Sequence, residues 1–338
     1  MTRTAHGLVL GKFYPLHAGH SHLIRTALSQ CARVTVQVLA SHQESIPLDT
    51  RVAWVREDHP GAHVVGAMDD AVVDYASEAA WAEHMAVIEA HLDAPVDAVF
   101  TSDAYGAELA RRLGARWVQV DPGRHEVPVS GTAVRANPAA HWHHLSAVVR
   151  RDLAARVVVT GAESTGSTTL ARALGARLGV PWVPEYGRDY TLERPGGLEA
   201  PWYAQDFDHI ASVQRVWEER ALRTTPRPLV ICDTDILATA LWQERYLGGH
   251  ATRLREQARD HTPALYLLTG DEIAWEDDGS RDGREIRHAM QERFREALAD
   301  SGVPWVELRG SVDERVEQAL VWIDREVRRH LTFSPPLG

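Results

Sequence analysis

One segment near the start of the chain places a lysine and two histidines where a strand gives way to a helix. Residues 7–20 read GLVLGKFYPLHAGH, an apolar run that ends at a glycine and a proline before a helical pattern begins. The start of a helix offers free backbone N–H groups and the positive end of the helix dipole, so it attracts anions. Lys12, His17 and His20 surround this point, and Gly19 lets the backbone approach a ligand closely. We therefore predict a phosphate site, with both histidines facing the same phosphate.

Lys12 is the only lysine of the chain, and every other strongly basic side chain is an arginine. A compact ammonium and a planar guanidinium are not equivalent in a tight pocket. A lysine that is kept only inside a phosphate motif therefore points to a specific role there.

A second motif, VSGTAVR at residues 129–135, carries further groups that suit a triphosphate. Ser130 is placed to cap a helix, with Thr132 and Arg135 on the side that faces the ligand. The forked guanidinium of Arg135 offers paired donors to phosphate oxygens. Together with the first motif, this segment predicts a nucleotide site rather than an ordinary capped helix.

The string GKFYPxHxGH resembles the signature of the nucleotidyltransferase superfamily with the HxGH motif, and the second motif resembles its Ile-Ser-x-Thr-x-x-Arg segment, with Val129 in place of Ile. The resemblance implies adenylyl or cytidylyl transfer from a nucleoside triphosphate carrying Mg²⁺, with pyrophosphate as the leaving group. The attacking phosphate is already ionised, so positioning and electrostatics supply the rate and no general base is needed. The predicted catalytic donors are Lys12, His17, His20 and Arg135. The predicted ATP contacts are Gly11, Phe13, Gly19, Ser130, Thr132 and Arg135, and the predicted substrate contacts are Trp81, Asp121 and Arg124.

The second half of the chain contains another strand-to-helix junction with a phosphate-binding pattern. The apolar run 156–160 leads into GAESTGSTT at residues 161–169, which has the frame of a P-loop, GxxxxGK[ST]. Its backbone N–H groups are expected to form a nest for phosphates, and Thr168 holds the position of the hydroxyl that binds Mg²⁺. The predicted ATP-binding residues here are Gly161, Glu163, Ser164, Thr165, Gly166, Ser167, Thr168 and Thr169.

Ser167 stands where a P-loop carries its lysine. Three interpretations follow from this replacement. An arginine from elsewhere in the chain supplies the missing charge; the site binds a nucleotide without turning it over; or the site uses another donor or another ligand.

Acidic residues that follow later strands favour a working kinase site. Glu185 lies at the end of the strand predicted at residues 183–186, and Asp233 follows the strand predicted at residues 228–232. A carboxylate in such a place can hold Mg²⁺ through water or accept a hydroxyl proton, so we predict Thr168 and Asp233 at the metal and Glu185 or Asp233 as the base. Arginines of the loop after residue 275 could close over the phosphates: Arg281, which we add to the ATP contacts, Arg284 and Arg287. Further predicted substrate contacts are Tyr186, Asp235, Trp275 and Asp278.

These residues require parallel sheets to position them, and the pattern of elements agrees. Strand and helix patterns alternate in both halves, which predicts an α/β protein with two parallel three-layer α/β/α domains. Strands are expected near residues 8–10, 34–39, 64–65, 98–102 and 117–120, and then near 156–160, 183–186, 228–232, 265–268 and 305–308. We place a Rossmann-like transferase domain at residues 1–150 and a P-loop kinase domain at 151–338. The last helix is expected at residues 312–330, followed by a frayed Pro-rich tail.

The composition sets limits on other functions. The chain has 338 residues, a net charge of −11 and two cysteines without a CxxC partner. The negative charge argues against a general nucleic-acid surface, and the cysteine pattern predicts neither a disulfide framework nor a zinc site. No apolar run reaches membrane-spanning length and no signal-peptide pattern is present. We expect a cytoplasmic enzyme that does not bind membranes, and the sequence leaves a homo-oligomer open.

The order of motifs, HxGH transferase and then P-loop with PEYxR, DTD and WxDDGxR, closely resembles the NadR family, from about residue 7 to 325. That resemblance implies an adenylyltransferase that makes NAD from nicotinamide mononucleotide (NMN) and ATP, joined to a kinase that makes NMN from nicotinamide riboside and ATP. Some members carry an N-terminal helix-turn-helix domain; with the first strand at about residue 7, we expect none here and no DNA binding. Because of Ser167, one alternative is an adenylyltransferase whose second domain senses a nucleotide or NAD. Another is adenylyl transfer to a different phosphorylated substrate.

Overall fold

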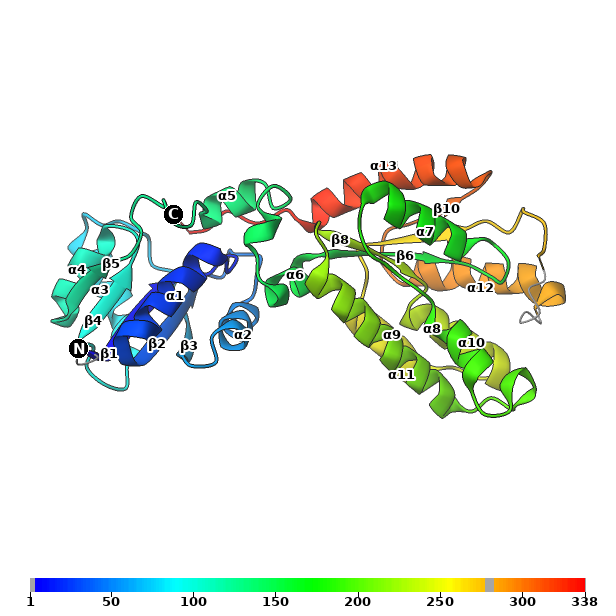
Figure 1. Cartoon of the computed structure of the whole chain (residues 1–338), viewed down its shortest axis with the longest axis horizontal. Coiled ribbons are helices and arrows are strands. Elements are labelled where there is room, and N and C mark those ends of the chain that lie inside the picture. The colour runs from blue at the N-terminus through cyan, green and yellow to red at the C-terminus, as the bar shows by residue number, and fades with distance from the viewer. Residues whose placement is uncertain (1–3, 277–282, 338) are drawn as a thin grey trace. The chain divides into compact units, whose positions relative to one another are not determined.

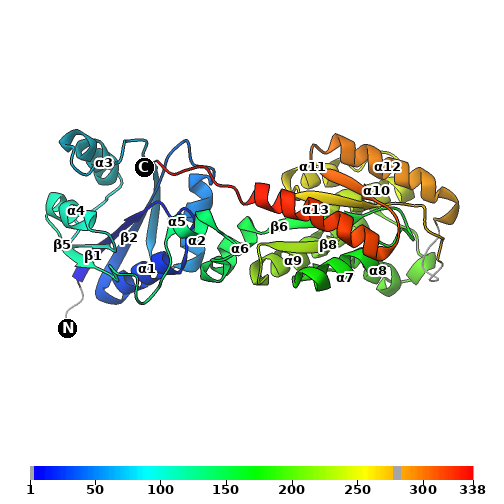
Figure 2. The ribbon, with the colours of Figure 1, turned by 90° about the horizontal axis from the view of Figure 1, so that it is seen from above.

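Over the residues that the computed structural model describes, 4–276 and 283–337, the strands form two separate sheets of five strands each. All paired strands in both sheets are parallel (Figures 1 and 2). The chain divides into two compact units, Met1–Val149 with Thr332–Gly338, and Arg150–Leu331. The predicted fold class, an α/β protein with two parallel sheets, is confirmed.

The first sheet has the order β3-β2-β1-β4-β5. Its strands are β1 (Thr4–Gly11), β2 (Cys31–Ala40), β3 (His63–Met68), β4 (Ala98–Thr101) and β5 (Arg116–Gln119). Its helices are α1 (Ala18–Gln30), α2 (Leu48–Asp58), α3 (Glu78–Ala90), α4 (Tyr105–Leu113) and α5 (Gly131–Ala136), followed by the 3-10 turn η1 (Trp142–His144) and α6 (Ala147–Leu153). The connections leave β1 toward β2 and return through β4, so the strand order reverses between β1 and β4. Ligands of open parallel sheets bind at such a switch point, beyond the carboxyl ends of the strands.

Apolar side chains on one face of this sheet pack against α3 and α4. Leu8 of β1 and Val99 of β4 lie side by side in the sheet register. Both are fully buried in a cluster with Met85 and Ile88 of α3 and Leu109 of α4. The spacing of Met85 and Ile88 gives α3 one apolar face.

The second sheet has the order β10-β9-β6-β8-β7. Its strands are β6 (Ala155–Thr160), β7 (Trp182–Val183), β8 (Leu229–Asp233), β9 (Leu265–Thr269) and β10 (Trp305–Leu308). Its helices are α7 (Ser167–Leu178), α8 (Tyr186–Glu193), α9 (Ala204–Thr224), α10 (Ile236–Leu247), α11 (Thr252–Asp260), α12 (Arg287–Asp300) and α13 (Val312–His330), with 3-10 turns η2 (Gly197–Glu199) and η3 (Arg284–Ile286).

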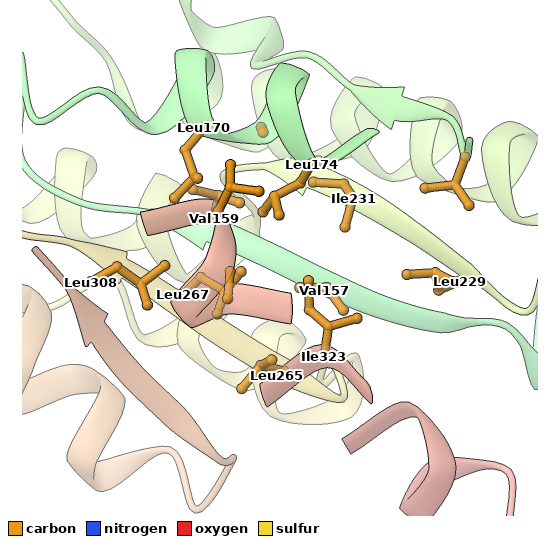
Figure 3. Close-up of a cluster of buried hydrophobic side chains, with 14 of the residues drawn as sticks. Val157, Val159, Leu170, Leu174, Leu229, Ile231, Leu265, Leu267, Leu308 and Ile323 are labelled. Atoms are coloured by element: carbon orange, nitrogen blue, oxygen red, sulfur yellow. The ribbon is translucent and has the colours of Figure 1, made fainter. Parts of the chain in front are cut away.

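The core of the second unit lies between its sheet and the pair α7 and α13. Val157 and Val159 of β6 alternate toward the same face and meet Leu170 and Leu174 of α7 and Ile323 of α13 (Figure 3). Burying such side chains stabilises the fold by about 1.5–3 kcal/mol each. This packing fixes α7, and with it the loop that precedes α7, against the carboxyl end of β6.

The C-terminal tail differs from the prediction in two ways. We assigned it to the second domain, but the residues from Thr332 on group with the first unit. The expectation of a frayed tail is wrong for its described residues. The backbone N–H of Ser334 donates to Ser45 Oγ at 3.2 Å, and its carbonyl accepts from the Tyr14 hydroxyl at 2.9 Å.

No helix among the described residues is long and apolar enough to cross a membrane.

Candidate functional sites

A cavity opens in the first unit at the switch point of its sheet. Its walls come from the ends of β1, β2 and β4 and from the start of α1. The predicted residues that line it are Gly11, Lys12, His17, Gly19, His20, Trp81, Asp121, Arg124 and Ser130. Segments far apart in the sequence therefore meet where open parallel sheets bind their ligands.

The two histidines sit at the start of α1 as neutral, stacked rings. His17 is the N-cap residue, and its Nδ1 accepts the backbone N–H of Gly19 at 3.1 Å. The rings of His17 and His20 stack with their centroids 3.7 Å apart. Burial and neighbouring positive groups lower the pKa of His17 to about 3 and hold the pKa of His20 well below its usual range. Because Nδ1 of His17 is an acceptor, its proton is on Nε2, so His17 offers a phosphate one neutral N–H donor.

Gly19 is required by this arrangement. A Cβ atom at residue 19 would lie 3.1 Å from the His17 ring and 3.5 Å from the carbonyl oxygen of Val129. A side chain here would push against the imidazole, so the glycine keeps both the ring and the helix start in place.

Lys12 is held by a buried acid that the sequence prediction missed. Glu44 Oε1 lies 3.1 Å from the Lys12 ammonium, and Oε2 lies 2.6 Å from the fully buried Arg51 guanidinium. Arg51 also donates to the carbonyl of Lys12 at 3.1 Å. Burial opposes ionisation of Glu44, but the hydrogen bonds and charges of Arg51 and Lys12 outweigh it and lower the pKa of Glu44. The only sequence sign of this group was its place in a polar loop at the ligand edge of the sheet.

Of the second motif, Ser130 lines the cavity, whereas Thr132 and Arg135 do not. Ser130 caps α5 by accepting the backbone N–H of Ala133 at 3.2 Å. Arg135 donates to the carbonyl of Tyr14 at 2.7 Å and to the Thr132 hydroxyl at 3.2 Å. Thr132 and Arg135 therefore bind each other beside the cavity and are not part of its lining.

The side chain of Phe13, a predicted ATP contact, does not line the cavity. Its ring is 1% exposed and packs on His20, with the ring centroids 4.9 Å apart. The Phe13 ring therefore packs against His20 and helps to hold its imidazole in place.

Trp81 of α3 is a wall residue rather than an open stacking surface. It is 6% exposed, Arg112 covers its ring at 5.0 Å, and its Nε1 donates to the carbonyl of Tyr75 at 3.1 Å. The stacked aromatic surface lies next to it, where the rings of Tyr75 and Tyr105 are nearly parallel with centroids 5.7 Å apart. The sequence prediction missed this tyrosine pair, because the residues belong to different elements.

The charged residues around the first cavity bond to the protein itself in three different ways. Asp121 accepts backbone N–H groups of its own loop, including that of His125 at 2.8 Å, which lowers its pKa despite partial desolvation. Arg124 pairs with Asp103 at 3.2 Å on the rim. Asp69 is only 9% exposed and lies 2.7 Å from His84 on the cavity wall.

The second unit holds its own cavity around the P-loop. The predicted residues that line it are Gly161, Glu163, Ser164, Gly166, Ser167, Thr168, Thr169 and Glu185. Gly166 has φ +85°, a conformation that favours glycine, directly before the first residue of α7. The backbone therefore forms the expected loop at a helix start, ready to receive an anion.

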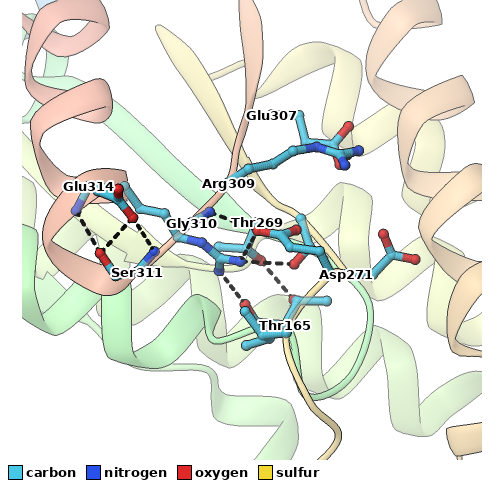
Figure 4. Close-up of polar contacts among 12 residues, drawn as sticks. Thr165, Thr269, Asp271, Glu307, Arg309, Gly310, Ser311 and Glu314 are labelled. Carbon is cyan, nitrogen blue, oxygen red and sulfur yellow. Dashed lines mark hydrogen bonds and ion pairs between the residues drawn. The ribbon is translucent and has the colours of Figure 1, made fainter.

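The loop is anchored from beneath by residues that do not reach the cavity. Thr165 is 1% exposed, and its hydroxyl lies 2.7 Å from that of Thr269. Arg315 of α13 is buried and donates to the carbonyl of Thr165 at 2.7 Å. Ser311 and Glu314 cap the start of α13 in the same network (Figure 4). The predicted ATP contact of Thr165 is therefore restricted to its backbone, because its side chain holds the loop.

Two side chains that line this cavity, Thr168 and Glu185, and the buried Asp233 behind Thr168 suit phosphoryl transfer. Val159 of β6 pairs with Asp233 of β8, so Asp233 lies beside the strand that precedes the P-loop. The Thr168 hydroxyl donates to Asp233 Oδ2 at 2.5 Å, and Oδ1 is buried without a hydrogen-bond partner among the described residues. Burial, with the nearby charge of Asp233, raises the pKa of Glu185 to about 7. Burial also raises the pKa of Asp233.

The hydroxyl and the carboxylate oxygens of Thr168 and Asp233 fit the preference of Mg²⁺ for oxygen ligands. Asp233 Oδ1 is buried and has no hydrogen-bond partner among the described residues. A cation would provide the missing partner, directly or through a water molecule.

Arginines that the prediction did not name line the P-loop cavity. Arg172 lies on α7 and Arg188 on α8, and both are close enough to stabilise the ionised form of Asp233. The Arg172 guanidinium lies over the ring of Trp182 at 4.8 Å. Arg188 is the arginine of the PEYxR motif, and this motif was the only sequence feature that could have identified it as a cavity residue. No sequence feature distinguished Arg172 from other helical arginines.

The predicted lid residues are only partly described. Arg281 and Asp278 lie outside the described residues. Arg287 donates to the carbonyl of Ser164 in the P-loop at 2.9 Å, whereas Arg284 is exposed.

Three predicted substrate contacts of the second unit lie elsewhere. Asp235 is 2% exposed, caps α10 through the N–H of Leu237 at 3.0 Å and accepts the Tyr266 hydroxyl at 2.7 Å. The Tyr186 hydroxyl lies 3.1 Å from Nε2 of His209, and Trp275 lies near the guanidinium of Arg287. None of the three lines the cavity. Its aromatic wall is instead made by Trp202, Phe207, Trp242 and Tyr246.

Known proteins are similar to this chain in sequence and in fold. A family model described as an AAA domain matches residues 156–315. The trifunctional NAD biosynthesis/regulator protein NadR of Escherichia coli (strain K12) is 26% identical over 321 residues, which cover 89% of this chain and 78% of that protein. The protein of the same name from Salmonella typhimurium (strain LT2) is 26% identical over 323 residues, covering 90% of this chain and 78% of the relative.

A solved structure of a NadR protein in complex with NR superimposes with a TM-score of 0.73 at 25% identity, covering 97% of both chains. This chain is a NadR-family homologue. A second NadR structure, in complex with NAD and AMP-PNP, has a TM-score of 0.72 at 24% identity over 96% of both chains and agrees in fold. The fold of NadR thus extends across both units, which no single motif of the sequence established.

Proposed function

We propose that the first unit transfers the adenylyl group of ATP to NMN, giving NAD and pyrophosphate, and that the second unit phosphorylates nicotinamide riboside to NMN. We assign the transferase to residues 1–150 and the kinase to residues 151–338, apart from the tail. The names of the E. coli and Salmonella relatives and the NR, NAD and AMP-PNP complexes of NadR structures support this proposal.

The observation that carries the transferase is the convergence of Lys12, His17 and His20 at the start of α1. A phosphate oxygen of NMN attacks the α-phosphorus of ATP, the bond to the bridging oxygen breaks, and pyrophosphate leaves. The NMN phosphate is already ionised, so the chain's own task is to hold two anions in line. The Lys12 ammonium and the neutral imidazole N–H donors stabilise the charge that develops on the triphosphate. Mg²⁺ bound to the triphosphate supplies further charge neutralisation.

Release of pyrophosphate from ATP and NMN tests this assignment. We expect Lys12→Met and His20→Ala to lower kcat/KM at least about 100-fold, the usual effect of removing a transition-state donor. Arg33→Met is the matched control, because Arg33 is an exposed cation that pairs with Asp93 away from the cavity. Full activity in both test variants contradicts the proposal.

The observation that carries the kinase is the cluster of Glu185, Asp233 and Thr168 at the P-loop. Glu185 is the better general base, because its raised pKa of about 7 lies near the working pH. It accepts the proton of the riboside 5′-hydroxyl as that oxygen attacks the γ-phosphorus and ADP leaves. Thr168 and Asp233 would hold Mg²⁺, which neutralises charge on the phosphates. The aromatic wall of the cavity suits a planar ring of the riboside.

The charge that Ser167 cannot provide is assigned to Arg172 and Arg188. Both line the P-loop cavity, and Arg172 extends from the helix that the P-loop opens. This favours catalysis over a purely sensing module, because the cavity lining contains Glu185, Thr168, Arg172 and Arg188, and Asp233 bonds to Thr168.

A compensation experiment separates these functions. We expect Arg172→Gln to raise the KM for ATP in riboside phosphorylation about tenfold or more. Ser167→Lys in the same background should restore much of the loss. Arg177→Gln, an exposed arginine on the same helix, should have no effect. Binding of ATP with no NMN formed, in the wild type and in Ser167→Lys, identifies a sensing module and refutes the kinase.

A further inference from the structure

The C-terminal tail lies across the phosphate-binding end of the first cavity. The Lys12 ammonium donates to the carbonyl oxygen of Leu337, and Leu337 is part of the cavity lining. Ser334 is fixed through both of its backbone groups, by Ser45 and by the Tyr14 hydroxyl. The ring of Phe333 meets that of Tyr14 edge to face at 6.1 Å. The tail is thus held along several residues and ends against the one lysine of the chain.

The contact uses a donor that the proposed transferase needs. The ammonium of Lys12 has three N–H groups. The ammonium forms an ion pair with Glu44 at 3.1 Å and donates a hydrogen bond to the Leu337 carbonyl, so the chain itself partly occupies it. Glu44 is buried and also bound to Arg51, so it is a fixed partner. The Leu337 carbonyl is the partner that a triphosphate oxygen can replace.

We propose that residues 332–337 form an autoinhibitory strap that competes with the triphosphate of ATP for Lys12. This proposal rests on the transferase function proposed above. In the strapped state, the neutral carbonyl of Leu337 takes the place of an anionic oxygen. An ammonium binds a phosphate oxygen more strongly than a carbonyl, so ATP displaces the strap. The apparent affinity for ATP is reduced by the fraction of molecules in which Lys12 is available.

The anchors of the strap allow matched variants in the full-length chain. The recorded hydrogen bonds of Ser334 use its backbone N–H and carbonyl. Ser334→Pro removes the N–H that Ser45 accepts, whereas Ser334→Ala keeps both backbone groups. A chain ending at Leu331 removes the strap but keeps α13, which ends at His330.

Two measurements test the strap. The first is the KM for ATP in pyrophosphate release. The second is the rate at which an amine-acylating reagent modifies Lys12, followed by mass spectrometry of the peptide that contains it. Because Lys12 is the only lysine, its signal is separate from that of every other side chain. ATP is then titrated into the acylation reaction to measure protection.

We expect the shortened chain to be acylated at Lys12 about tenfold faster and to have a KM for ATP about tenfold lower, with kcat unchanged. Ser334→Pro should shift both quantities in the same direction, and Ser334→Ala neither. Equal acylation rates in the shortened and full-length chains overturn the proposal. A higher KM or a lost activity on shortening also overturns it, because the tail would then be part of the catalytic site. If no chain releases pyrophosphate and ATP protects Lys12 in none, the transferase proposal fails, while the acylation rates still decide whether the tail covers Lys12.

Discussion

Replacement of Glu185 by glutamine is expected to stabilise the second unit at alkaline pH while removing the base of the kinase. The pKa of Glu185 is raised from 4.5 to about 7, first by burial and then by the charge of Asp233. A carboxyl whose pKa is raised in the folded state loses stability as pH increases from the unfolded pKa to the folded one. Full stability is thus present below about pH 4.5, and the loss is complete above about pH 7.

The shift from 4.5 to about 7 corresponds to about 3 kcal/mol above pH 7. Glu185 keeps some contact with solvent at the cavity wall, so screening by water reduces the expected gain to about 1–3 kcal/mol at pH 8. At pH 5 the same variant should gain less than about 1 kcal/mol, because wild-type Glu185 is then protonated in the fold and only partly ionised in the unfolded chain.

Urea unfolding of the full-length protein at pH 5 and pH 8 measures this difference, with Glu199→Gln as the control because Glu199 is exposed in the same unit. Riboside phosphorylation by Glu185→Gln should fall by about 10²–10⁴-fold. In the wild type, kcat/KM should rise with pH to a plateau above about 7. A stability gain that is equal at both pH values, or a variant that still phosphorylates the riboside, refutes the assignment.

Three further predictions concern residues of the first unit. Gly19→Ala should lower pyrophosphate release at least about tenfold, because the new Cβ would lie 3.1 Å from the His17 ring; wild-type rates would contradict the packing. The pKa of His17 is about 3, so a pH–rate profile of the transferase should show no loss between pH 8 and pH 5 from protonation of His17. A histidine titration near pH 6 that disappears in His17→Asn would be evidence against neutral rings. Glu44→Gln should destabilise the protein by about 2–4 kcal/mol in urea unfolding, because it leaves the buried Arg51 without its carboxylate, and an unchanged midpoint would refute that pairing.

The sequence predicted the sheets well because strand and helix patterns are local. The start of α1 and the P-loop were both found from short, contiguous motifs that put glycines next to polar residues. Asp235 and Asp233 have the same residue type and both follow the predicted strand, and only packing shows that Asp235 caps α10 whereas Asp233 accepts the Thr168 hydroxyl. Glu44, Arg172 and the Tyr75–Tyr105 pair could not be found, because their roles depend on distances between elements remote in the sequence.

The division of the chain at Val149 and again at Leu331 makes the first unit discontinuous, with the second unit as a long insertion between its two pieces. During synthesis, the piece with Lys12 leaves the ribosome long before Thr332 is added, and N-terminal parts generally fold first. The contact between Lys12 and the Leu337 carbonyl therefore forms only after residues 150–331, the whole second unit, have been synthesised.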